Sequence, residues 1–158
     1  MDPKTVSMLR RLVTESRILT LAVQPAGELV LGVLPFLAES DLQTLVVHAS
    51  RLAKHSRGLF AGAPFSAAMH EPDHPDADPL ALPRLLFSGA VEAVADAERR
   101  RLESAWIERF PSAVMTLSLG DFAFHRLRIA SGRLIAGFAQ AYSIGPRQLE
   151  LAAAQRDA

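Results

Sequence analysis

The sequence predicts a mainly β fold with flanking helices, organised as an antiparallel Greek-key or split β-barrel. Three β-rich segments follow one another closely between residues 18 and 47, which is the spacing of an antiparallel meander. Four further strand patterns follow, at residues 65–69, 84–94, 121–129 and 133–138. Because these strands do not alternate regularly with the two or three helical patterns, a barrel is favoured over a βαβ sheet.

The N-terminal elements are predicted from two different periods. Between Thr5 and Val13 the apolar residues recur at helical spacing, so a short helix is expected there. The apolar runs on both sides of Gln24-Pro25-Ala26-Gly27 are two strands joined by a hairpin, because Pro-x-Gly favours a turn. Leu42 to Val47 is the third strand, after a polar break.

The middle of the chain is predicted to contain a helix, a strand, a loop and a long strand. From Ser50 to Gly62 the apolar residues take a helical period that glycine closes. Phe65 to Met69 is a strand, and residues 70–83 form a loop because proline and acidic residues dominate them. The long strand, Arg84 to Val94, contains Gly89, where a bulge or bend would suit closure of a barrel.

The C-terminal elements begin with a helix that Asp96 is predicted to cap and Pro111 to end. Its apolar residues align at intervals of four: Leu102, Trp106 and Phe110. Asp121 to Ile129 alternates as a strand, with the phenylalanines and arginines on one side and Ala123, His125, Leu127 and Ile129 on the other. Ser131-Gly132 is predicted to turn the chain into a last strand, 133–138, and the tail 146–158 either docks as a helix or frays.

Composition predicts a single domain, 1–158, whose core spans about residues 5–145. The 158 residues are 49% hydrophobic, and 17 basic side chains balance 17 acidic ones, so we expect no nucleic-acid partner. The lack of cysteine excludes disulfides, thiolate zinc sites and cysteine nucleophiles. No apolar run has the length of a membrane span or signal peptide, so the expected location is cytoplasmic, with no membrane partner.

The densest polar segment lies at the predicted strand-to-helix junction and includes His48, Ser50, Lys54, Ser56 and Arg57. Hydroxyls, cations and the free N–H groups of a first helical turn would converge there, which favours binding of a phosphate. The alternative is that the cations form only the solvated face of an amphipathic helix.

Other polar residues have structural explanations beside functional ones. His70, His74 and the acids between and after them suggest an oxygen and nitrogen metal site, but a solvated loop explains them better, so we predict no metal site. His125 is expected to be a partly buried strand histidine. Asp121 is either a turn residue or a carboxylate that orients a histidine.

Four ordered motifs resemble the pyridoxamine 5′-phosphate oxidase-like split barrels, and most closely their haem-utilisation (HugZ-type) branch. These motifs are SRLAKHSRGL (50–59), LPRLLFSG (82–89), LGDFAFHRL (119–127) and RLIAGF (133–138). The resemblance covers residues 5 to 145. It implies a six-stranded split barrel of the FMN-binding type that forms a homodimer, with a cofactor in the cleft between the subunits.

In the flavin-binding members, the second strand lines the isoalloxazine ring, and the segment after the third strand holds the FMN phosphate. Carried over to this sequence, the ring would lie against Val33, Leu34 and Pro35. The phosphate-binding candidates are Ser50, Lys54, Ser56 and Arg57, with His48 beside them and Arg84 from a later strand. The phosphate site inferred from charge falls on the same segment.

In the haem-degrading members, a C-terminal histidine ligates iron, while a motif histidine and an aspartate interact across the dimer. His55 and Asp121 match the last two and are the candidate catalytic residues. No histidine follows Tyr142, so haem ligation would fall to His125 or another histidine.

The leading hypothesis is therefore a dimeric FMN-binding flavoprotein, an oxidoreductase of unknown substrate in which flavin supplies the redox chemistry. The alternatives are a haem-binding or haem-degrading protein, and a dimer that binds a small molecule without catalysis.

Overall fold

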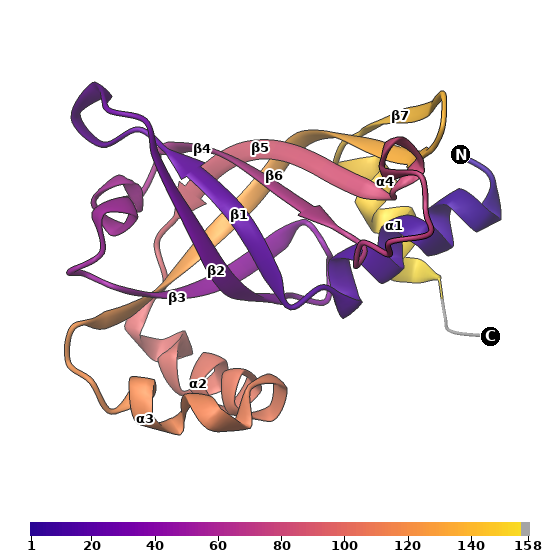
Figure 1. Cartoon of the computed structure of the whole chain (residues 1–158). Coiled ribbons are helices and arrows are strands. Elements are labelled where there is room, and N and C mark those ends of the chain that lie inside the picture. Colours follow the sequence, from indigo (N-terminus) through magenta and orange to yellow (C-terminus); the bar gives the residue numbers. More distant parts are fainter. Residues whose placement is uncertain (156–158) are drawn as a thin grey trace.

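Residues 1–155 are described by the computed structural model, in which six strands close an antiparallel barrel and four α-helices lie outside it (Figure 1). The strands run in the order β3-β2-β1-β4-β5-β6, and pairing of β3 with β6 closes the barrel. The strands are β1 (Ile18–Val23), β2 (Val30–Ala38), β3 (Thr44–Ser50), β4 (Pro64–His70), β5 (Arg84–Glu92), β6 (Phe122–Gly137) and β7 (Gln140–Ile144). The predicted six-stranded barrel is confirmed, with β7 as an additional strand beside the second half of β6.

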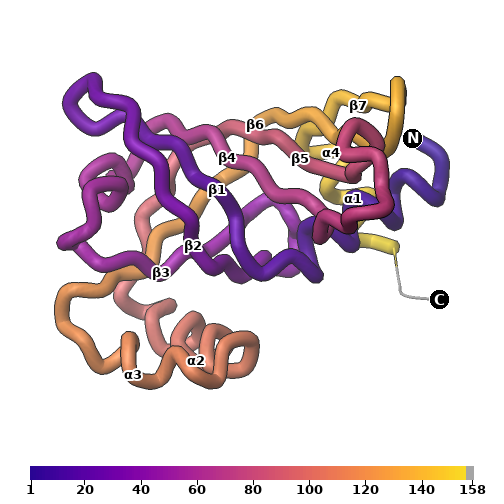
Figure 2. The backbone as a smooth tube through the Cα atoms, viewed as in Figure 1, coloured from indigo at the N-terminus to yellow at the C-terminus, as the bar shows by residue number. Residues whose placement is uncertain are grey.

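The four helices lie in two groups. At one end of the barrel α1 (Pro3–Glu15) lies beside α4 (Pro146–Ala154), while α2 (Arg99–Arg109) and α3 (Val114–Leu117) lie together next to β3 (Figure 2). The predicted N-terminal helix is confirmed, and the side chain of Asp2 caps it by accepting a hydrogen bond from the Thr5 N–H. The tail docks as α4 up to Ala154, and residues 156–158 lie outside the described residues.

The core fills the barrel and continues beneath α1. Leu21, Phe36, Leu45, Leu85 and Leu127 come from five different strands, and each is fully buried. Along β6 the predicted alternation is confirmed, because Leu127 and Ile129 point into the core while Phe124 and Arg126 lie on the other face. No helix of the described chain is long and apolar enough to cross a membrane.

Two glycines permit close approach of β5 and β6. The register shifts between Ser88 and Gly89, so the predicted bulge is confirmed. The predicted turn at Ser131-Gly132 is wrong: β6 runs on to Gly137, and the chain reverses there before β7. Gly132 serves strand pairing instead, since a Cβ at this position would lie 2.8 Å from the Leu86 carbonyl oxygen.

Two helix predictions are also wrong. Between Ser50 and Gly62 the chain forms a turn and a five-residue 3₁₀ helix, η2 (Lys54–Gly58), in place of an α-helix. Gly58 is buried there against Val23, with which any Cβ would collide, so the glycine packs against the barrel instead of ending a helix. Asp96 does not cap α2, because a short 3₁₀ turn begins at this residue and no side chain caps either helix start.

Substitution of Gly89 tests the bulge. A Cβ at this position would lie 1.8 Å from the Arg128 carbonyl oxygen, so Gly89→Ala should cost about 2–3 kcal/mol of unfolding free energy in urea denaturation. Gly120→Ala is the control, because a Cβ at that position would have no neighbouring atom within 4 Å, and the substitution should change stability by less than about 0.5 kcal/mol. Equal stability of the two variants would contradict the bulge geometry.

Candidate functional site

A cavity of about 480 Å³ lies between the barrel and the α2–α3 segment. Five of the residues selected from the sequence line it: Leu34, Pro35, His48, Ser50 and His55. The other lining residues are Ala49, Ala53, Trp106, Phe110, Ser112, Ala113, Thr116 and Phe122. No lysine, arginine, aspartate or glutamate is among them, so the cavity favours an uncharged, largely apolar group.

Aromatic rings form one side of this cavity. His48 projects from β3 and packs against three rings, with centroid distances of 4.4 Å to Phe124, 5.1 Å to Phe122 and 5.8 Å to Trp106. Burial lowers the pKa of His48 to about 4, and the Arg99 guanidinium acts in the same direction. The imidazole is therefore neutral at pH 7, so the cavity offers planar, uncharged surfaces on which a flat ring can stack.

Hydroxyl groups order the end of β3. Ser50 donates a hydrogen bond of 2.5 Å to the Asp121 carboxylate, and Ser56 donates one of 2.6 Å to the Ser50 carbonyl oxygen. The backbone N–H of Arg51 donates to the Asp121 carbonyl oxygen. Both candidate serines are thus engaged in fixing the turn between β3 and η2, and Asp121 joins the start of β6 to that turn.

His55 is held against β2 by the absence of a side chain at Gly32. A Cβ on Gly32 would lie 2.7 Å from Nδ1 of His55. Burial lowers the pKa of His55, and its Nε2 is buried with no hydrogen-bond partner. Burial also lowers the pKa of His125, whose Nε2 is likewise unpartnered, although a hydrogen bond to the Leu59 backbone opposes this shift.

Asp121 and His55 form no hydrogen bond or ion pair with each other within residues 1–155. The Asp121 carboxylate accepts from Ser50 instead. Asp121 therefore does not orient His55 within residues 1–155.

The predicted cations lie outside the cavity. Lys54 and Arg57 are exposed on η2, next to the cavity-lining Ala53 and His55. Because η2 is a short 3₁₀ helix, no α-helical first turn supplies the N–H groups expected for the anion site, and the charged side chains of Lys54 and Arg57 are the groups present to attract an anion. They form a positive rim beside an uncharged cavity.

Val33 and Arg84 lie elsewhere on the molecule. Val33 is 64% exposed on the outer face of β2 and lines a second cavity, of about 630 Å³, beside α1. Arg84 starts β5 opposite His70, at the end of β4 remote from η2, and donates hydrogen bonds to the Pro79 and Leu82 carbonyl oxygens. One chain therefore does not bring Arg84 to the other phosphate candidates.

The loop after β4 is confirmed as irregular structure apart from a short 3₁₀ turn, η3 (Pro79–Ala81). His74 in this loop contacts Asp76. Within residues 1–155 no three His, Asp or Glu side chains are grouped so that they would hold a metal ion.

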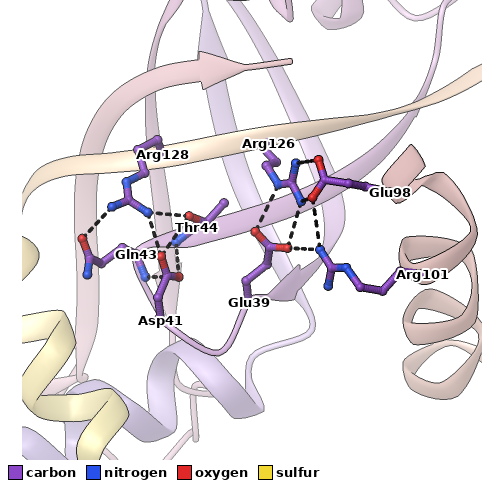
Figure 3. Close-up of polar contacts among 8 residues, drawn as sticks. All are labelled: Glu39, Asp41, Gln43, Thr44, Glu98, Arg101, Arg126 and Arg128. Carbon is purple, nitrogen blue, oxygen red and sulfur yellow. Dashed lines mark hydrogen bonds and ion pairs between the residues drawn. The ribbon is translucent and has the colours of Figure 1, made fainter. Parts of the chain in front are cut away.

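The sequence did not reveal an ion-pair cluster that attaches α2 to the barrel (Figure 3). Arg126 of β6 donates two 2.7 Å hydrogen bonds to the Glu98 carboxylate and two of 3.1 Å to the Glu39 carboxylate. Arg101 of α2 also pairs with Glu39. The alternation along β6 correctly predicted that Arg126 lies outside the core. Its partners Glu39 and Glu98 are far from it in the sequence, so their contact with Arg126 could not be predicted.

Comparison with known proteins gives a match in structure but not in sequence. No family model and no curated protein matches the chain. A heme binding protein from Mycobacterium smegmatis is 21% identical with a TM-score of 0.80, covering 95% of this chain and 61% of that protein. The heme storage protein HutZ from Vibrio cholerae is 25% identical with a TM-score of 0.67, covering 80% of this chain and 89% of HutZ.

A third solved structure is a general stress protein 26-related member of the pyridoxinephosphate oxidase family from Clostridium acetobutylicum. It is 14% identical with a TM-score of 0.68, covering 94% of this chain and 99% of that protein. This chain has their split-barrel fold. The resemblance inferred from the four motifs is therefore confirmed. The chain spans only 61% of the length of the Mycobacterium smegmatis protein.

The depressed pKa of His48 predicts a loss of stability in acid. Below pH 6.5 the unfolded chain binds a proton on His48, whereas the folded chain does so only below about pH 4. Unfolding is therefore favoured as the pH falls through this interval, by roughly 2–3 kcal/mol in total.

His48→Phe keeps a ring in the cluster and removes this proton uptake. Urea denaturation at pH 7 and pH 4.5 should show a smaller acid-dependent loss for the variant than for the parent protein. Identical losses would mean that the folded protein protonates His48 near its ordinary pKa.

Proposed function

We propose that the 480 Å³ cavity binds the ring of a planar redox cofactor, with FMN as the first candidate. The observation that carries this proposal is the separation of an uncharged aromatic cavity from a cationic rim. A flavin ring would stack beside the neutral His48 and Trp106, while its phosphate would lie outside the cavity near Lys54 and Arg57.

The residues present fit such a group. Ser112, Thr116 and the His55 imidazole are polar side chains in the lining of an otherwise apolar cavity, and Nε2 of His55 is a buried polar atom with no partner. Such polar groups suit the edge of a flavin ring. When bound, FMN would supply one-electron or hydride transfer. The chain itself would bind the phosphate, orient the ring and limit access of water, and we infer an oxidoreductase whose substrate the sequence does not identify.

Haem is the second candidate, because solved structures of this fold include a heme binding protein and a heme storage protein. Among the five histidines of the sequence, His48 and His55 line the cavity. His48 is stacked within the aromatic cluster, whereas His55 has the unpartnered Nε2. His55 is therefore the first histidine to test as an iron ligand, whereas His125 is not among the residues that line the cavity.

We also propose that the protein is a homodimer that buries the outer face of β2, β1, β4 and β5. Two rows of neighbouring residues cross this face from β2 to β5, and neither contains a charged side chain. The first row is Leu31, Ala22, Ser66 and Ser88, and the second is Val33, Thr20, Ala68 and Leu86. Leu31 is 65% exposed. A large, uncharged and partly apolar sheet face is typical of a protein interface, and a second copy has the matching surface.

This interface would adjoin the cofactor cavity, because Pro35, two residues after Val33 and on the same face of β2, lines the cavity. A second subunit would then help to enclose the ligand. The cytoplasmic location stays a prediction from the sequence.

Titration of the purified protein with FMN and with haemin tests the cofactor, with the visible spectrum as the readout. Saturable flavin bands are expected, and Lys54→Ala and Arg57→Ala should each weaken FMN binding about tenfold, since each removes one charge-assisted contact to phosphate. Arg147→Ala is the control because Arg147 is exposed on α4, at the other end of the barrel.

Three outcomes of this titration are informative. Equal FMN affinity in all three variants would contradict the proposal that Lys54 and Arg57 bind the phosphate. A Soret band that His55→Ala abolishes would select haem in place of FMN. A protein that stays colourless with both compounds would contradict the cofactor proposal.

Sedimentation velocity tests the dimer. The parent protein should sediment as a dimer, and Leu31→Glu should shift it to a monomer because the charge would enter the interface. Leu151→Glu is the matched control, since Leu151 is 51% exposed on α4 and lies off this face. A monomeric parent protein would refute the interface.

A further inference from the structure

The segment between β5 and β6, residues 93–121, forms one wall of the proposed cofactor cavity. It supplies Trp106 and Phe110 from α2 and the following residue, and Ser112, Ala113 and Thr116 from the turn and α3. The barrel supplies the opposite wall through β2 and β3. Access to the cavity therefore depends on how firmly this segment is attached to the barrel.

The apolar attachment of the segment is small. Its buried apolar side chains are Leu102 and Trp106 of α2 and Phe110 directly after the helix. Further along, the side chains of Val114 and Met115 are 57% and 76% exposed. Apolar packing is thus concentrated on three side chains, and polar contacts hold the remainder of the segment on the barrel.

The polar attachment at the start of α2 centres on Arg126. Its side chain is only 10% exposed, and it binds the Glu98 carboxylate with two hydrogen bonds just before α2 begins (Figure 3). Glu39, in the turn after β2, binds both Arg126 and Arg101 of α2. The Arg126 hydrogen bonds, opposed by partial desolvation, lower the pKa of Glu98 to about 2, so this carboxylate is charged at neutral pH.

A second polar attachment lies at the end of α2. Arg109 donates a 2.6 Å hydrogen bond to the Ser16 carbonyl oxygen and one of 3.3 Å to that of Phe36. Beyond it, the hydroxyls of Thr116 and Ser118 bond only to backbone oxygens of their own segment. The segment is thus fixed to the barrel at the two ends of α2 and again at its last residues, where the Ser50 hydroxyl and the Arg51 N–H bond to Asp121 and the Arg51 guanidinium bonds to the Gly120 carbonyl oxygen.

We propose that the Arg126–Glu98 ion pair is a latch that holds the α2–α3 segment over the cavity as a removable cover. The latch joins the cover to β6, the strand that also carries Phe122 at the cavity and Phe124 against His48 and Trp106. Release of the latch lets the segment move outward, so it sets how fast a planar ligand enters and leaves. This proposal rests on the proposed function for the identity of that ligand, but the state of the cover can be measured without any ligand.

Trp106 provides this measurement, because it is the single tryptophan of the sequence, is 2% exposed and lies in the cover. The variant is Glu98→Gln, which keeps the size of the side chain and removes the ion pair with Arg126. The matched control is Glu103→Gln, since Glu103 lies in the same segment but pairs only with Arg99 of its own helix.

In the ligand-free protein, Glu98→Gln should shift the Trp106 emission to longer wavelength and increase its quenching by acrylamide, while Glu103→Gln should leave both unchanged. Far-UV circular dichroism should show that both variants are folded. Identical Trp106 emission and quenching in the two variants would overturn the latch.

A second pair of variants tests the other side of the latch. Arg126→Met should have the same effect as Glu98→Gln. Arg128→Met should not, because Arg128 lies two residues further along β6 and binds Asp41, Gln43 and Thr44, none of which belongs to the cover. An equal response to Arg126→Met and Arg128→Met would contradict a specific latch.

If FMN or haemin binds, stopped-flow dissociation adds a second readout. Its rate should rise about tenfold in Glu98→Gln relative to Glu103→Gln, the factor expected for loss of one charge-assisted contact that holds the cover. An unchanged rate would show that the cover does not control release. If neither compound binds, the cofactor proposal fails, while the Trp106 measurement still decides whether the latch exists.

Discussion

Pairing of β3 with β6 is the constraint on which the rest of the structure depends. It closes the barrel, and it places His48, Phe122 and Phe124 together on the outer face of two adjacent strands. The same face carries Arg126, which needs carboxylate partners because its side chain is largely buried. The α2–α3 segment covers this face and supplies both the carboxylate of Glu98 and the indole of Trp106. The cavity and the ion pair that holds the segment are therefore both formed between the same face of β3 and β6 and the same segment.

Strands were easier to predict from the sequence than the connections between them. The alternation along β6 gave the correct inward and outward faces, because the period of two reports directly on burial. The prediction of a turn at Gly132 was wrong. A glycine that leaves room for the carbonyl oxygen of a neighbouring strand, here that of Leu86, cannot be distinguished in the sequence from a glycine in a turn. The segment after Ser50 has a helical period in the sequence, but the chain forms a 3₁₀ helix there, with Gly58 packed on Val23 of the barrel.

For the candidate site, the sequence located the polar residues at the end of β3, but not the wall opposite them. The spacing of Trp106 and Phe110 correctly predicted a buried helix face. The spacing does not distinguish a side chain that packs in the core from one that borders a cavity, and both residues line the cavity. The fold also separates roles that the sequence grouped together. Ser50 and Ser56 order a turn, Lys54 and Arg57 form a rim, and Arg84 lies at the far end of the barrel. An uncharged cavity beside a positive rim suits a planar ring with an anionic tail, which both FMN and haem possess.

A crystal structure of the protein grown with FMN, with a parallel crystal grown with haemin, tests this account most directly. We predict ring density inside the 480 Å³ cavity, stacked beside His48 and Trp106, with the phosphate or propionate groups directed toward Lys54 and Arg57. Density for the ring at another surface, with this cavity empty, would contradict the assignment of the cavity as the cofactor site.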